Sequence, residues 1–544
     1  ISYTDNDGYE ESITISSEIT EVNNGLASFS VDGDLLFGQS LSLIKESQDV
    51  DGLEGTLSYS WQSSSDNSNW SEIGTEETYT ITSEEEGKYI QAVISYQDGQ
   101  GFSNESIASI TGSTSWIQQG NDIEIDISGD HYSWLPSLGG NSIIISDDGS
   151  HVFAESGGGR VYGWDSEKND WNIVSNSFED LGFGTPEGIS FSADGSIVAL
   201  GFPTDNTNGE NSGKTSIFKF INGEWSQLGN DIYGESYRNS LSNKYVGFSG
   251  TSLDLSADGN YLAIGAPSET TWTKLNNLEG VVRIYEYKNG DWSQIGNNIY
   301  GETFQDYYGE VFNLSADGSR VAIGAGGNDG DTIDNGKRTG DYRGRVRIFE
   351  YINDNWTQIG NNINGAATYD HAGESLSLSA DGSIIAIGSG ANGGSKNDGG
   401  SIRIFEDPNG TWQQLGPDID GKNEIFNISA QPESISISSD GRTLAFGVNQ
   451  QGVDGEIHSW GYDPEELSYL KVYRYSQDSD NWSQVGNDIN GIDSDDRFGH
   501  FLSISEDGSY IAVNALEGVE IGEDVVDAAE KIRIFKEVST NIVP

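Results

Sequence analysis

The sequence predicts an all-β protein in which a seven-bladed β-propeller follows a smaller β-sandwich. Three observations lead to this prediction. A tryptophan-centred segment recurs seven times, an Asp-Gly turn between two apolar runs recurs seven times, and a short strand of the type VRIYEY accompanies most of these turns. Units of this size cannot bury both faces of a sheet alone, so they stack on their neighbours into a common core.

The composition excludes several classes of protein. The 544 residues include 27 basic and 87 acidic side chains, which gives a net charge of −60. A nucleic-acid binder needs clustered Lys and Arg, so that class is excluded. Cys and Met are both absent, which removes disulfides and thiol chemistry and suits an extracellular protein. No apolar run approaches the length of a membrane-spanning helix.

The first complete domain is expected between residues 23 and 113. Its segments FGQSLSL, DVDG, YSWQSSSDNSNW, YTIT and GKYIQAVISYQDGQG resemble a bacterial immunoglobulin-like domain of the kind found in tandem in giant cell-surface proteins. The resemblance implies that Trp61 is a core residue and Tyr89 a corner residue, although no Cys pair accompanies them.

The start of the chain repeats the end of that domain. ISYTDNDGY at residues 1–9 matches ISYQDGQGF at residues 94–102. We therefore expect residues 1–22 to be the terminal strands of a preceding immunoglobulin-like domain, and the natural polypeptide to continue upstream with tandem copies.

The propeller is expected over residues 114–544. An Asp-Gly pair between alternating apolar residues is a strong hairpin signal, because glycine accepts the positive φ of a tight turn. We name the strands on either side A and B. The turns lie at Asp148, Asp194, Asp258, Asp317, Asp381, Asp440 and Asp507.

Strand C is the VRIYEY-like element, and strand D is the tryptophan segment that follows it after a short polar turn. The D strands contain Trp116, Trp171, Trp225, Trp292, Trp356, Trp412 and Trp482. The series begins with a lone D strand at Trp116 and ends after a C strand at Lys536. We therefore expect the N-terminal D strand to complete the last blade, which would remove two exposed sheet edges. At these repeated positions a structural role is the expected one.

The units VAIGAG…GRVRIFEY and LAIGAP…GVVRIYEY resemble the FG-GAP repeats of integrin α-subunit-type propellers, over about residues 115–536. That family often holds calcium in the A–B turn. Here the turn has shrunk to SADGS, which is too short to surround a calcium ion with six to eight oxygens, so the family's calcium sites do not carry over.

The long B–C and D–A connections share one rim of the expected propeller, and function concentrates on such loops. Aromatic residues near acids and amides on this rim could stack on sugar rings, or could instead pack between blades. These candidate ligand-binding residues are Tyr233, Tyr237, Tyr300, Phe304, Tyr307, Tyr308 and Tyr369.

One loop between strands B and C is a candidate Ca²⁺ site, because it is dense in hard oxygen ligands. Its residues are Asn328, Asp329, Asp331 and Asp334. The loop lacks the ligand offsets of an EF-hand, and a solvated acidic loop is the alternative.

No catalytic residue is predicted, because the five His are scattered and no nucleophile or phosphate-binding motif is present. We expect a non-enzymatic extracellular or cell-surface protein for adhesion or surface assembly, whose partner is a surface protein or glycan. The alternatives are a calcium-assisted lectin and a polysaccharide-acting enzyme.

Overall fold

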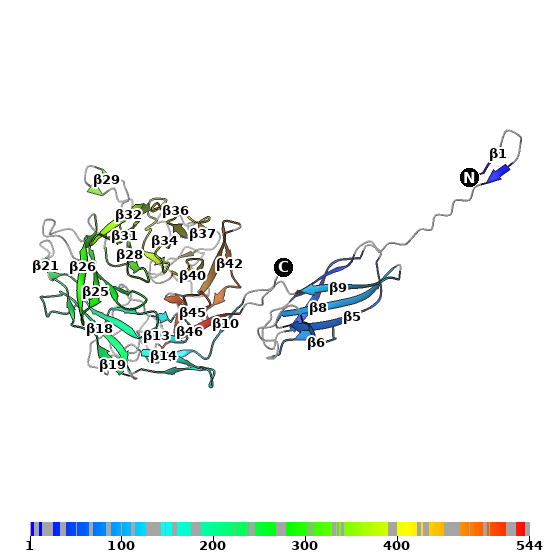
Figure 1. Cartoon of the computed structure of the whole chain (residues 1–544), viewed down its shortest axis with the longest axis horizontal. Coiled ribbons are helices and arrows are strands. Elements are labelled where there is room, and N and C mark those ends of the chain that lie inside the picture. Colours follow the sequence, from blue (N-terminus) through cyan, green and yellow to red (C-terminus); the bar gives the residue numbers. More distant parts are fainter. Residues whose placement is uncertain are drawn as a thin grey trace, which may run out of the picture. The chain divides into compact units, whose positions relative to one another are not determined.

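The structure is a computed structural model, and every regular element in its described part is a β-strand (Figure 1). It describes residues 2–4, 10–12, 26–32, 40–49, 52–64, 69–82, 89–99, 101–109, 115–126, 143–146, 148–154, 160–175, 186–221, 224–235, 237–238, 245–267, 279–302, 306, 308–328, 333–334, 337–338, 342–389, 400–420, 426–427, 435–450, 468–477, 479–492, 498–499, 501–517 and 529–538. Within these ranges, no helix is long and apolar enough to cross a bilayer. The chain divides into two units, Ile1–Ser115 with Val538–Pro544, and Trp116–Glu537.

The first unit contains two antiparallel sheets around one core. The smaller sheet has the order β3 (Ser28–Asp32), β4 (Ser40–Ser47), β7 (Tyr79–Thr80). The larger sheet has the order β6 (Ser71–Gly74), β5 (Leu53–Ser64), β8 (Tyr89–Asp98), β9 (Ser103–Ser109). Trp61 is fully buried in this core, and its indole Nε1 donates to the Glu76 carbonyl at 3.0 Å. The strands β1 (Ser2–Thr4) and β2 (Glu10–Ser12) pair with each other. The Tyr89 side chain is outside what is described.

The second unit is a series of antiparallel sheets whose strands follow the chain order A, B, C, D. The first three are β12 (Ile143–Ile145), β13 (His151–Ala154), β14 (Arg160–Asp165), β15 (Asp170–Ile173); then β16 (Gly188–Phe191), β17 (Ile197–Phe202), β18 (Lys214–Ile221), β19 (Glu224–Gln227) with β20 (Ile232–Tyr233); then β23 (Leu253–Leu255), β24 (Tyr261–Ala266), β25 (Val281–Lys288), β26 (Asp291–Tyr300).

The next sheets repeat this order. They are β27 (Phe312–Leu314), β28 (Arg320–Ala325), β31 (Arg345–Ile352), β32 (Asn355–Asn364); then β33 (Ser375–Leu378), β34 (Ile384–Ser389), β35 (Ser401–Glu406), β36 (Gln413–Gln414) with β37 (Ile419–Asp420); then β39 (Ile435–Ile437), β40 (Thr443–Gln450), β41 (Tyr469–Ser476), β42 (Asn481–Gln484) with β38 (Phe426–Asn427) and β43 (Ile489–Asn490). Two short hairpins, β21 (Tyr237–Arg238) with β22 (Tyr245–Val246) and β29 (Ile333–Asp334) with β30 (Lys337–Arg338), lie in long connections.

The last sheet joins the two ends of the second unit. It contains β44 (Leu502–Ile504), β45 (Tyr510–Glu517) and β46 (Ala529–Val538), followed by β10 (Ser115–Gln118) and β11 (Ile123–Asp126) from the start of the unit. Ile123 is opposite Ile532 in the antiparallel register, and the Gln119 amide donates to the Ile534 carbonyl at 2.7 Å. A segment near residue 120 therefore supplies the outer strands of a sheet formed near residue 530.

The sheets are arranged around an axis, as in a β-propeller, because the A strands of successive sheets surround one central cavity. Apolar side chains fill the space between neighbouring sheets. One such cluster joins Ile217 of β18 to Leu255 of β23 and Trp292 of β26. The all-β class predicted from the sequence is confirmed.

The repeated turn sequence has two structural roles. In the turn after β16, Ser192 Oγ donates to Asp194 Oδ1 at 2.8 Å and accepts the Ile197 amide at 2.9 Å, which locks the hairpin. The second residue of each turn also links neighbouring sheets through its backbone. Along the series Ala193, Ala257, Ala316, Ala380, Ser439, Glu506, the amide of each of the first five residues donates to the carbonyl of the next at 2.8–3.0 Å.

The repeated tryptophans join neighbouring sheets at the outside. In five of the seven, the indole Nε1 donates to a carbonyl in the preceding D segment at 2.9–3.2 Å. The pairs are Trp116–Val485, Trp171–Gln119, Trp292–Leu228, Trp356–Ile295 and Trp482–Leu415. The glycine after this carbonyl is required, because at Gly229 φ is 77° and a Cβ would lie 2.8 Å from the Trp292 ring.

Candidate functional site

The structure places three of the predicted ligand-binding aromatics, Tyr233, Tyr300 and Tyr369, at least partly in solvent. Tyr233 is 41% exposed in β20, and its hydroxyl donates to Asp231 at 3.3 Å. Tyr300 ends β26 and is half-buried, and its hydroxyl accepts a hydrogen bond from Asn298 at 2.8 Å. Tyr237 belongs to β21, but its side chain is outside what is described. Phe304 and Tyr307 lie outside the described residues.

Tyr308 is not a surface residue, contrary to the prediction from the sequence. Its side chain is only 1% exposed, its backbone bridges Gly280, and the Arg347 guanidinium lies 5.6 Å from its ring centre. Burial raises the pKa of its hydroxyl. The ring packs inside the sheets, which was the alternative role considered for these aromatics, so it cannot contact a ligand on the rim.

The described residues include only part of the candidate Ca²⁺ loop. The Asn328 side chain is 1% exposed, and its Nδ2 donates to Asp306 Oδ1 at 2.8 Å. Asp329 and Asp331 lie outside the described residues, and Asp334 is placed in β29 without a described side chain. In the part of the chain that the structure describes, no three His, Asp or Glu side chains are grouped as a metal site would require.

Three aromatic side chains form a stack on the connections that lead into β31 and β33. Tyr342 precedes β31, while Tyr369 and His371 precede β33. The Tyr342 ring lies 5.7 Å from Tyr369 with an interplanar angle of 22°, and 5.7 Å from His371 with an angle of 18°. Tyr369 is 40% exposed. We call these three residues the aromatic stack.

Backbone pairing brings the two connections together. Gly344 and Ala372 form a parallel bridge, the His371 amide donates to the Tyr342 carbonyl at 3.1 Å, and the Ala372 amide donates to the Arg343 carbonyl at 3.0 Å. Gly344 has φ of 73° and leaves no room for a Cβ against Ala372. This close approach fixes the distance between Tyr342 and His371.

All members of the aromatic stack adopt left-handed backbone conformations, with φ of 42° at Tyr342, 66° at Tyr369 and 51° at His371. Aromatic residues rarely occupy this region, and such strain costs about 1–3 kcal/mol per residue unless the surroundings impose it. Backbone strain of this kind is often found at functional sites, where a side chain must point in a particular direction.

An acidic residue holds His371 in place. Its Nδ1 lies 3.0 Å from Glu374 Oε1. Hydrogen bonding to Glu374 raises the pKa of His371, and burial only partly opposes this effect. Asp370 is buried beside it and accepts the Ala367 amide at 2.7 Å. The aromatic stack is therefore bordered by carboxylates.

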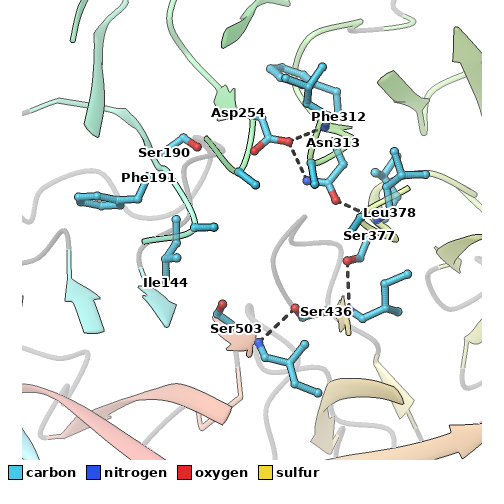
Figure 2. A pocket seen from close by; sticks show the side chains of 18 of the residues that line it. Ile144, Ser190, Phe191, Asp254, Phe312, Asn313, Ser377, Leu378, Ser436 and Ser503 are labelled. Carbon is cyan, nitrogen blue, oxygen red and sulfur yellow. Dashed lines mark hydrogen bonds between the residues drawn. The ribbon is translucent and has the colours of Figure 1, made fainter. Parts of the chain in front are cut away.

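The central cavity has a volume of about 290 Å³ and is lined by the A strands (Figure 2). Polar side chains at the middle of these strands face the cavity. Each accepts a hydrogen bond of 2.5–3.4 Å from the backbone amide of a residue on the next A strand. The pairs are Ser190–Leu255, Asp254–Leu314, Asn313–Leu378, Ser377–Ile437, Ser436–Ile504 and Ser503–Ile145. These side chains link neighbouring sheets across the cavity wall.

Asp254 is the acidic member of this polar series. Its Oδ2 accepts the Leu314 amide at 2.5 Å and Asn313 Nδ2 at 3.0 Å. Burial raises its pKa to about 7, against the opposing effect of these hydrogen bonds. Since one oxygen already serves two donors, the carboxyl group belongs to the link between β23 and β27. The aromatic stack, in contrast, exposes the Tyr369 side chain to solvent, and we take it as the candidate site.

Sequence reasoning identified Tyr369 but missed Tyr342 and did not assign His371 to a site. The available signal was a pair of aromatic residues placed before strands C and A of consecutive sheets, in TGDYRGRV and ATYDHAGE. That signal becomes informative only when the Gly344–Ala372 bridge is known.

No family model matches the chain, and no curated protein sequence matches it. Solved structures with a similar overall fold include the β-propeller domain of Cps50 (Swd1) from Myceliophteria thermophila. That likeness has a TM-score of 0.42 and 10% identity and covers 76% of this chain and 99% of the other. Periplasmic gluconolactonase PpgL of Pseudomonas aeruginosa has a TM-score of 0.39 and 16% identity, with 74% and 100% covered. Oligogalacturonate lyase of Vibrio parahaemolyticus has a TM-score of 0.41 and 13% identity, with 78% and 98% covered. No activity transfers to this chain at such identities.

Proposed function

We propose that this chain is a non-enzymatic, exported binding protein for adhesion or surface assembly, in which a β-propeller presents a binding face on its long-loop rim. The observation that carries the proposal is the aromatic stack. Exposed, rigid aromatic rings in strained loops are typical of binding surfaces, because a large contact area is presented with little side-chain entropy to lose.

The repeated residues support a division between scaffold and binding face. Five of the seven repeated tryptophans, the turn serines and the polar residues of the cavity wall form hydrogen bonds between or within sheets. Such positions recur from sheet to sheet and serve the fold. The three residues of the aromatic stack do not recur from sheet to sheet in this way, so the requirements of the fold do not explain their presence.

The finer architecture is part of the same proposal. The sheets closed by β10 and β11 are the blades of a seven-bladed propeller of FG-GAP-like type. The two sheets around Trp61 are an immunoglobulin-like domain that acts as a spacer, one of several in tandem. The partner is a cell-surface protein or glycan, and the long acidic B–C loop at residues 328–334 is the place where Ca²⁺ would bind.

A single-thiol experiment tests the binding face, because the chain has no Cys of its own. Ala366→Cys places a thiol on the exposed loop before β33, and Glu506→Cys places one on an exposed A–B turn. Each variant would be modified with a bulky polyethylene glycol maleimide and coupled to beads. Adhesion of the beads to collagen, fibronectin, laminarin and galactomannan would then be counted.

We expect the modification at position 366 to block adhesion and the modification at position 506 to leave it unchanged. Block only at position 506 would contradict the proposed face. Turnover of either polysaccharide by the unmodified chain would contradict a non-enzymatic role.

A further inference from the structure

We propose that the aromatic stack is a subsite for an uncharged sugar ring. The sugar ring lies against Tyr369, whose own ring is held in place by Tyr342, and Tyr342 in turn stacks with His371. The proposal rests on the proposed function and specifies its ligand class. Neither the repeats nor the cavity wall requires such a site.

The geometry of the stack favours a flat ligand. Interplanar angles of 22° and 18° mean that the Tyr369 and His371 rings each lie nearly parallel to the Tyr342 ring. A cage for a quaternary ammonium group needs aromatic faces that converge on one point. Parallel rings instead present a flat apolar face, which matches the C–H face of a pyranose.

Exposure identifies the ring that contacts the sugar. Tyr369 leaves 40% of its side chain in solvent, whereas Tyr342 and His371 are half-buried. Stacking on Tyr342, which is itself stacked with His371, keeps Tyr369 in one orientation. A preordered ring loses little entropy when it binds, which raises affinity without adding contacts.

Backbone strain separates Tyr369 from the common loop geometry. The bridge between Gly213 and Ser249 has the same construction as the one between Gly344 and Ala372, and there Asn211 and Phe248 also have positive φ, 50° and 52°. Tyr342 and His371 therefore inherit their conformations from the fold. Tyr369 has φ of 66°, while Val246, the corresponding residue two positions before Phe248, lies in the regular strand β22.

The electrostatics of the rim select against acidic sugars. Glu374 lies beside His371, and Glu310, whose pKa is raised by burial and by Glu374, is part of the same surroundings. The whole chain carries a net charge of −60. A uronate or sialate would be repelled, whereas carboxylate oxygens accept hydrogen bonds from neutral sugar hydroxyls.

A donor for sugar hydroxyls is also present. The half-buried Arg343 guanidinium reaches the second connection, where its Nη1 lies 3.4 Å from the Ala366 carbonyl. Its Nε is buried, so its terminal N–H groups are the donors that a sugar hydroxyl could meet. The site thus combines an apolar face, an acceptor and a donor, the usual elements of a small-molecule site.

Affinity electrophoresis of the full chain in laminarin, galactomannan and dextran tests the proposal, with polygalacturonate as the anionic polysaccharide. We expect at least one neutral polysaccharide to retard the chain and polygalacturonate not to. Tyr369→Ala should weaken that binding about tenfold, since a stacked ring contributes on this scale. Tyr369→Phe should retain it.

Tyr233→Ala is the matched control: Tyr233 is another aromatic that the sequence predicts to bind ligand and has nearly the same exposure, 41%, but it lies in β20, outside the aromatic stack to which the proposal assigns the sugar. It should bind like the unaltered chain, and thermal unfolding should confirm that all variants are folded. Equal losses in Tyr233→Ala and Tyr369→Ala, or binding of polygalacturonate alone, would overturn the proposal. Choline competing with the sugar would overturn it as well, since that result indicates a cation site.

The two proposals fail separately. If no polysaccharide retards the chain while beads still adhere to collagen or fibronectin through the rim, the sugar subsite is wrong and the binding function stands. If a neutral polysaccharide binds through Tyr369 but the beads adhere to nothing, the subsite stands and the adhesive role is wrong.

Discussion

Two loop junctions of the second unit share one backbone construction but carry different side chains. At the first junction, Gly213 bridges Ser249 and the positive-φ positions hold Asn211 and Phe248. At the second, Gly344 bridges Ala372 and those positions hold Tyr342 and His371. The amide of the second positive-φ residue donates to the carbonyl of the first in both cases, at 3.0 and 3.1 Å. The fold therefore fixes the backbone, and the choice of side chain decides whether a binding surface results.

The largest expected effect tests whether the junctions are structurally equivalent. A Cβ at Gly213 would lie 2.1 Å from the Ser249 carbonyl oxygen, and a Cβ at Gly344 would lie 2.1 Å from the Ala372 amide nitrogen. Gly213→Val and Gly344→Val should each lower the free energy of unfolding by about 3 kcal/mol or more, through strain and overpacking. Urea denaturation measures this, and a clear inequality between the variants would show that the junctions differ in more than side chains.

The second expected effect comes from making the second junction resemble the first. Tyr342→Asn removes the ring that stacks with both Tyr369 and His371, while Asn tolerates positive φ well. Binding of a neutral polysaccharide should weaken about fivefold to tenfold, and the melting temperature should change little. The reverse change, Asn211→Tyr, serves as the control and should create no binding. Unchanged affinity of Tyr342→Asn would remove Tyr342 from the site.

Calcium should sharpen the difference between the junctions, because the candidate loop at residues 328–334 precedes only the second. An ion that binds the folded state alone raises the melting temperature with concentration. We expect a rise of a few degrees in CaCl₂, reversal by EDTA, and loss of the effect in Asp331→Asn. A melting temperature that is the same in CaCl₂ and EDTA would exclude calcium from this loop.

The smallest expected effect is a pH dependence confined to the second junction. Because Glu374 raises the pKa of His371, the folded state binds the proton more tightly than the unfolded chain. This stabilisation is fully present below the ordinary His pKa of about 6.5 and is lost as the pH rises through the raised value. With the ion pair nearly one-third exposed, the contribution should be below about 1 kcal/mol.

Comparing urea denaturation of the unaltered chain and of Glu374→Gln between pH 5.5 and 8.5 isolates this contribution. The difference in unfolding free energy between them should shrink as the pH rises. Asp370 and the Gly326 backbone also affect His371, but both remain in the variant. A constant difference across this range would indicate that His371 and Glu374 do not interact as the structure implies.

The sequence predicts those parts of the molecule that repeat. The Asp-Gly turns and the tryptophan segments each have a local cause, and local chemistry can be read along the chain. Tyr308 shows the limit of this reasoning. Tyr308 occupies the same junction position as Ala372 and Ser249, and the side chain at this position is buried. From the sequence alone, however, Tyr308 belongs to a loop that is rich in aromatic residues and expected to be exposed. Tyr342 could not be assigned for a related reason, since its neighbours come from a connection 27 residues away and depend on loop conformation.

The pairing of β10 and β11 with β46 has a mechanical consequence. Trp116 and Glu537, the two ends of the second unit, belong to adjacent antiparallel strands of one sheet. Tension applied between these two residues would break the hydrogen bonds between the strands one after another, starting from this end of the sheet. The bonds would not be loaded all at the same time. The resistance to the first step would come from the side chain of Trp116, whose indole is anchored to Val485 of the neighbouring sheet.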